Sequence, residues 1–84
     1  MSLAYIELTV LQTKPAAFVL SEKLGLENFK IIEEGKIRIY DDRVSTQELA
    51  KVLTKNQVDV TELGKKAETL EDYFLKMTEP EVGP

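Results

Sequence analysis

The chain has 84 residues, of which 43% are apolar and 31% charged, and its formal net charge is −4. A chain of this length forms one small domain, and its acidity disfavours nucleic acid and anionic membranes as partners, since both attract basic surfaces. It contains no cysteine and no histidine. Disulfides and thiolate zinc sites are therefore excluded, and the commonest general base is missing. We find no signal peptide and no apolar run approaching the roughly 20 residues that span a bilayer.

The first two predicted elements are a strand and a helix. Residues 5–11 alternate, with Ile6, Leu8 and Val10 on one face, which is typical of a half-buried strand. A helix is expected to begin near Thr13, because Pro15 in its first turn loses no hydrogen bond. Its apolar side is expected to carry Ala16, Ala17, Leu20 and Leu24. The helix is expected to end at Gly25, in the left-handed conformation, with Leu26 as the following apolar contact.

The next pattern is a hairpin between residues 28–32 and 36–40. A three-residue loop over 33–35 keeps apolar side chains on one face, whereas a two-residue loop would mix the faces. The expected pairs are Ile31 with Ile37 and Phe29 with Ile39. Gly35 then lies at the left-handed bulge position.

A second helix and a fourth strand follow. Ser45 to Glu48 has the form of a capping box, with Val44 and Leu49 placed as a hydrophobic staple. The helix is expected to fade at Asn56-Gln57, and Val58–Leu63 is expected to form the strand. We interpret residues 64–68 as a linker.

A third helix is expected after Thr69, which is interpreted as its N-cap. Its apolar stripe is Leu70, Tyr73, Phe74 and Met77. Two roles for this stripe are open: it closes part of the domain's own core, or it packs on a second domain or subunit.

The order of elements predicts an α+β fold. Strand, helix, strand, strand, helix, strand is the split β-α-β, or ferredoxin-like, βαββαβ pattern. Right-handed crossovers give an antiparallel sheet of order 4-1-3-2 with two helices on one face, and the last helix is extra. Residues 1–3 are expected to be a remnant of expression, residues 4–78 a single α+β domain, and residues 79–84 a flexible tail.

No catalytic, cofactor-binding or metal-binding residue is predicted. The four glycines are isolated, so neither a phosphate loop nor a dinucleotide fingerprint can be written. Ser45 has no histidine to activate it and is interpreted as a helix cap. The acidic pairs Glu33-Glu34 and Asp41-Asp42 are interpreted as solvated turn residues.

The helix-free face of the sheet is the main candidate for contact with another molecule. Alternation assigns it Tyr5, Glu7, Thr9, Lys30, Ile32, Arg38, Tyr40, Asp59 and Thr61. Stacked RNA bases are disfavoured by the net acidity and by the missing ribonucleoprotein motif. Two interpretations stay open: a protein interface, since Tyr and Arg are enriched at interfaces, and an ordinary solvated face. The candidate interaction residues are Tyr5, Phe18, Ile32, Arg38, Tyr40 and Tyr73, Phe18 because it lies off the apolar stripe of its helix.

Four segments carry a resemblance to a known family. They are residues 27–32, residues 37–41, the helix after Ser45, and residues 69–75. Together they resemble the C-terminal accessory region of bacterial ABC transporter ATP-binding proteins of the bacitracin and multidrug export type. The resemblance implies a non-catalytic accessory or regulatory domain without a cofactor, whose ATPase domain lies outside this chain, and it implies a link to antibiotic resistance.

The same resemblance implies partners and a location. The partners would be the N-terminal ATPase domain of the same protein, a second ATP-binding subunit and, indirectly, a membrane permease; a homodimer is also compatible. The location would be cytoplasmic, peripheral to the inner face of the cell membrane, without insertion. The alternative is a free-standing ferredoxin-like regulatory module that binds a small metabolite at a subunit interface. That alternative calls for a glycine-containing loop after the first strand, and residues 11–15 contain no glycine.

Overall fold

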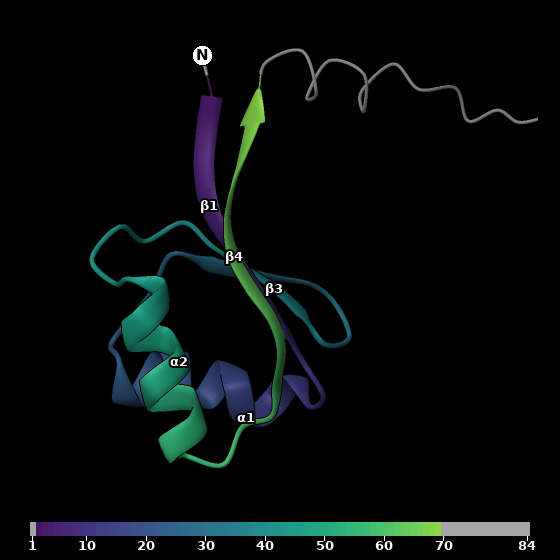
Figure 1. Ribbon diagram of the computed structural model, residues 1–84, viewed down its shortest axis with the longest axis vertical. Coiled ribbons are helices and arrows are strands. Elements are labelled where there is room, and N and C mark those ends of the chain that lie inside the picture. The colour runs from purple at the N-terminus through teal and green to yellow at the C-terminus, as the bar shows by residue number, and fades with distance from the viewer. Residues whose placement is uncertain (1, 70–84) are drawn as a thin grey trace, which may run out of the picture.

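Figure 1 shows the computed structural model, which describes residues 2–69. The elements, in chain order, are β1 (Ser2–Val10), α1 (Thr13–Phe18), the π-helical turn η1 (Val19–Lys23), β2 (Phe29–Glu33), β3 (Lys36–Ile39), α2 (Thr46–Lys55) and β4 (Val60–Thr69). The four strands form one sheet of order β2-β3-β1-β4, and its three pairings are all antiparallel. The predicted α+β fold and the predicted order, read from the opposite edge, are confirmed.

The core lies between one face of the sheet and the helices, which all lie on that face (Figure 1). Its sheet side comes from alternate residues of the central strands: Ile6, Leu8, Val10, Ile37 and Ile39. Its helix side comes from Ala16, Val19, Leu20, Leu49 and Leu53. Because strand side chains alternate, the residues between the buried ones face away from the helices.

The first helix forms as predicted but changes its winding. The N–H of Leu24 donates to the carbonyl of Val19, five residues earlier, at 3.0 Å. The buried side of the helix consists of Thr13, Ala16, Val19 and Leu20, at the three- and four-residue spacing of one helix face. Val19 was missing from the predicted stripe, and Ala17 and Leu24 are only half-buried. Gly25 ends the helix at φ +66°, and Leu26 packs into the core as expected.

The β2–β3 hairpin has the predicted inner register. Ile31 lies opposite Ile37 and Phe29 opposite Ile39. The predicted three-residue loop over 33–35 is wrong: Glu33 pairs with Lys36, so the loop is the two residues Glu34 and Gly35. The extra residue is Ile32 rather than Gly35, and the register shift there keeps the inner pairs on the core face despite the shorter loop.

The tip of this hairpin is held against the end of β1. Gly35 has φ +84°, its carbonyl accepts from the N–H of Val10 at 2.8 Å, and its N–H donates to the buried Thr13 hydroxyl. These two hydrogen bonds fix the hairpin against the β1–α1 connection.

The predicted cap of α2 is confirmed. The Ser45 hydroxyl oxygen accepts from the N–H of Glu48 at 3.1 Å, which satisfies one of the free donors at the helix start. Val44 and Leu49 are both buried, as a hydrophobic staple requires.

The end of the described chain differs from the prediction. The expected linker over residues 64–68 is wrong: these residues continue β4, which runs to Thr69 and pairs with β1 back to Ser2. Thr69 is thus the last residue of β4, and Ser2 and Leu3 belong to β1. The cause is β1 itself, because its long free edge offers a hydrogen-bonding partner to residues whose own propensities are weak. The third helix, Tyr73 and the tail lie outside the described residues.

Candidate interaction surface

One face of the sheet, the open face, is not covered by the helices of the described residues. Its members follow from the register: Tyr5, Glu7 and Thr9 on β1, Lys36, Arg38 and the adjoining Tyr40 on β3, Lys30 and Glu33 on β2, and Glu62, Gly64 and Lys66 on β4. Ile32, the extra residue of the bulge in β2, lies beside Glu33. Residues directly opposite each other in paired strands point to the same face, and for these pairs it is the face away from the core.

Two tyrosines and an arginine form a cluster at the centre of this face. The rings of Tyr5 and Tyr40 lie 5.7 Å apart, centre to centre, with an interplanar angle of 50°. The guanidinium carbon of Arg38 lies over the Tyr5 ring, 4.7 Å from its centre. Tilted rings at this spacing attract each other, and a cation over a ring is attracted by the ring's quadrupole. The three side chains are half-buried and hold one another in place.

The net charge of the open face is opposite in sign to the net charge of the whole chain. The open face carries four cations, Lys30, Lys36, Arg38 and Lys66, and three carboxylates, Glu7, Glu33 and Glu62, so its net charge is +1, while the whole chain is at −4. Glu7 is shielded, since its side chain is 15% exposed and it pairs with Lys36 at 3.5 Å. The open face therefore presents positive charge around an aromatic centre.

The structure brings together three of the candidate interaction residues, Tyr5, Arg38 and Tyr40. Ile32 is 43% exposed at the bulge in the outer strand β2. Phe18 is 58% exposed on α1, in the helix layer, so it belongs to a different surface. Tyr73 lies outside the described residues.

On β4 the open face extends beyond the residues that alternation assigned to it. Asp59 precedes the strand, and the register shifts between Val60 and Glu62, so Thr61 is the extra residue of a bulge. Glu62, Gly64 and Lys66 also face outward. Glu62 was missed because the bulge shifts the alternation counted from Val58, and Gly64 and Lys66 were missed because residues 64–68 were expected to form a linker.

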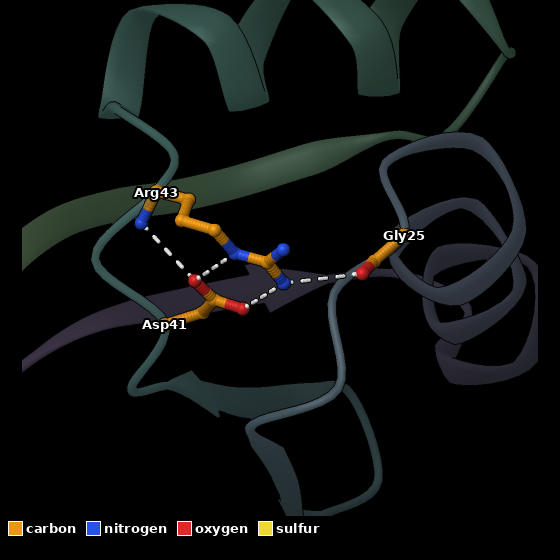
Figure 2. A network of polar contacts seen from close by, with 3 residues as sticks. All are labelled: Gly25, Asp41 and Arg43. Carbon is orange, nitrogen blue, oxygen red and sulfur yellow. Dashed lines mark hydrogen bonds and ion pairs between the residues drawn. The ribbon is translucent and has the colours of Figure 1, made fainter.

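A polar network ties the loop before α2 to the end of the first helix (Figure 2). The Arg43 side chain donates to Asp41 Oδ1 from Nε at 2.9 Å and to Oδ2 from Nη2 at 2.6 Å, and Nη2 also donates to the carbonyl of Gly25 at 3.2 Å. The Arg43 side-chain hydrogen bonds, joined by one from its backbone N–H, lower the pKa of Asp41 from 3.8 to about 2. The same pairing raises the pKa of Arg43. Asp41 therefore has a structural partner and is more than a solvated turn acid.

A hollow of about 150 Å³ lies where β1 continues beyond the end of β3. Its lining includes Ala4, Tyr5, Asp41 and Lys65. Pockets for drug-sized ligands measure roughly 300–1,000 Å³, so this hollow is small for a metabolite. Within residues 2–69, no three His, Cys, Asp or Glu side chains gather in a way that could hold a metal ion. None of the helices described is long and apolar enough to cross a membrane.

The fold and the site together define a small α+β domain whose distinctive feature is a surface rather than a catalytic pocket. No family model matches the chain, and no solved structure matches it. Among curated proteins it is similar to ATP-binding proteins of ABC transporters. The ABC transporter ATP-binding protein YcbN of Bacillus subtilis is 45% identical over 73 residues, which are 87% of this chain and 24% of that protein.

Two bacitracin transport ATP-binding proteins are also similar. BcrA of Enterococcus faecalis is 34% identical over 73 residues, covering 87% of this chain and 23% of that protein. BcrA of Bacillus licheniformis is 25% identical over 73 residues, covering 87% and 24%. The chain thus spans about a quarter of the length of the curated relatives it matches.

Proposed function

We propose that this chain is a non-catalytic accessory or regulatory domain of the ATP-binding subunit of an ABC-type exporter. The observation that carries the proposal is the extent of the similarity: 87% of this chain matches 24% of YcbN at 45% identity. About three quarters of that protein therefore lies outside the match and has room for an ATPase domain. This chain has four isolated glycines and no histidine, so it cannot supply a phosphate loop or a switch histidine.

The open face is the surface through which such a domain would contact its neighbours. Tyr5, Arg38 and Tyr40 already hold one another, so little side-chain freedom would be lost on binding. Tyr and Arg in a half-buried cluster are the residue types that carry most binding energy at interfaces. The positive charge around them favours an acidic patch on the partner.

The proposal assigns partners and a location. The first partner is the ATPase domain of the same protein, and the second is a further ATP-binding subunit, with a membrane permease reached indirectly. The domain would act in the cytoplasm, at the inner face of the cell membrane. The names of two relatives add bacitracin transport as the kind of export to test first.

The test uses a full-length ATP-binding protein that carries this sequence. Tyr40→Ala and Ile32→Asp are made there, with Lys51→Ala on the exposed side of α2 as the control. We expect the first two variants to lower ATP hydrolysis and to weaken subunit association about tenfold, the equivalent of roughly 1.4 kcal/mol for one interface anchor. Lys51→Ala should behave as the unmodified protein.

Two results would count against this proposal. If both open-face variants match the unmodified protein in hydrolysis and in association, the open face is merely solvated. If the 84-residue chain alone hydrolyses ATP, the domain is catalytic and the assignment is wrong.

A further inference from the structure

Strand β4 has a long edge that faces no described strand. It is ten residues long and lies at one end of the sheet order, paired with β1 along its other edge. The bulge at its start leaves Glu62–Thr69 as a regular stretch with no proline. Sheet edges in proteins are usually shortened, bulged or covered, because an open edge is a template for pairing with another strand.

The backbone direction along this edge follows from one hydrogen bond. The N–H of Val10 donates to Gly35, next to β3, so Val10 bonds toward β3. Because backbone groups alternate along a strand, Thr9, Glu7 and Tyr5 bond toward β4. Their partners there are Glu62, Gly64 and Lys66. The N–H and C=O groups of Leu63 and Lys65 therefore point to the open edge.

The side chains along this edge have a symmetric charge pattern. Glu62 and Lys66 are exposed on the open face, two residues before and two residues after Gly64. Gly64 has no side chain, and a Cβ placed there would meet no atom within 4 Å. The sequence Glu-x-Gly-x-Lys is complementary to itself when it is reversed.

We propose that β4 pairs antiparallel with β4 of a second copy of this chain, about a two-fold axis through Gly64. Leu63 then lies opposite Lys65 of the second copy, and these pairs exchange four backbone hydrogen bonds. Glu62 of each copy lies opposite Lys66 of the other, so the axis generates two such charge pairs. Both charge pairs occupy non-hydrogen-bonded positions, where opposed side chains come closest. The product is an eight-stranded sheet with its helices on one side and its two open faces joined.

Neighbouring registers are less favourable. An axis through Lys65 or through Lys66 sets two ammonium groups against each other, and like charges directly opposite are destabilising. An axis through Leu63 brings the bulge at Thr61 into the new ladder. The axis through Gly64 combines regular backbone with two attractive pairs. Since five residues from each chain form the contact, the isolated chain is expected to associate weakly and with strong salt dependence.

Charge reversal tests this pairing. Glu62→Lys places a lysine at position 62 opposite Lys66 of the second copy at each end of the contact. Lys66→Glu likewise places two glutamates opposite each other. We expect each single reversal to weaken self-association, measured by sedimentation equilibrium at low salt over a range of concentrations, at least about tenfold. The double variant E62K/K66E restores the opposite charges and should recover association. Glu48→Lys, the same change of charge on α2, is the control and should have no comparable effect.

A second variant tests the backbone bonds. Lys65→Pro removes an N–H that points to the edge, where proline is tolerated because no β1 bond is lost. It should abolish association while the circular dichroism spectrum is retained. The proposal is wrong if the unmodified chain is monomeric at every concentration, if Glu62→Lys has no effect, or if the double variant fails to recover. A monomer whose Leu63 and Lys65 amides are protected from exchange would show that residues 70–84 cover the edge instead. The pairing is a property of this chain alone and stands or falls apart from the function proposed above.

Discussion

Replacing Gly35 by alanine is expected to destabilise the domain far more than the same change at Gly25. Both glycines have positive φ, +84° and +66°. Holding an L-residue in this conformation costs roughly 1–2 kcal/mol, and both variants bear that cost. The two sites differ in space: a Cβ at Gly35 would lie 2.8 Å from the carbonyl oxygen of Val10, while a Cβ at Gly25 would meet nothing within 4 Å.

The difference between the two variants isolates the steric term. The Val10 carbonyl is backbone, and Val10 N–H itself bonds to Gly35 at 2.8 Å, so neither group can move away freely. Overpacking of this kind costs about 1–3 kcal/mol. The total expected is about 1–2 kcal/mol for Gly25→Ala and about 2–5 kcal/mol for Gly35→Ala. Any gain from restricting the unfolded chain is the same in both and cancels.

Urea unfolding followed by circular dichroism measures the difference. With a slope of about 1 kcal/mol per M, an extra 1–3 kcal/mol lowers the midpoint of Gly35→Ala by about 1–3 M below that of Gly25→Ala. The free energy of unfolding of a domain of this size is roughly 4–13 kcal/mol. At the lower end of that range, Gly35→Ala is expected to leave the domain partly unfolded in buffer. Equal midpoints for the two variants would refute the close approach of the hairpin tip to β1.

Three further changes probe the core, the buried hydrogen bond and the polar network. Leu53→Ala should lower the free energy of unfolding by about 2–5 kcal/mol, because Leu53 is fully buried in α2; a loss below 1 kcal/mol in a denaturant melt would contradict its place in the core. Thr13→Val should cost about 1–3 kcal/mol and speed amide exchange at Gly35, since it leaves that buried N–H without its acceptor; Thr13→Ser, which keeps the acceptor, should leave this exchange slow. Asp41→Asn should lower the melting temperature near neutral pH, because it removes the charged partner of Arg43. The pKa of Asp41 is depressed to about 2 when folded, so its contribution is complete above its ordinary pKa of 3.8 and is lost as the pH falls from there toward 2; a gap between the variant and the unmodified chain that persists at the lowest pH would contradict the ion pair.

Most of the fold could be predicted from the sequence because its signals are local. The Ser45 cap, the left-handed Gly25 and the inner pairing of Ile31 with Ile37 each rest on neighbours within a few residues. Each is set by backbone conformation or by alternation, which the sequence displays directly.

The errors fall where a distant partner decides the structure. Residues 64–68 contain a glycine and charged residues, which favour a loop by local preference. They form a strand because β1 offers a partner edge that is far away in the sequence. The bulge at Thr61 is a second consequence of that pairing, and it moves Glu62 and Lys66 onto the open face. Alternation counted from Val58 could not have located a shift that only the partner strand imposes.

The two proposals meet on the open face. Pairing through β4 would join the open faces of two copies into one surface, with a cluster of Tyr5, Arg38 and Tyr40 in each half. A partner that binds this joined surface would bind more tightly to the dimer than to either copy, because the second contact becomes intramolecular. In the full-length ATP-binding protein, Lys65→Pro should then weaken subunit association while the amide exchange of Tyr5 and Arg38 is unchanged. If association is lost with Tyr40→Ala but kept with Lys65→Pro, the open face binds its partner without the edge pairing.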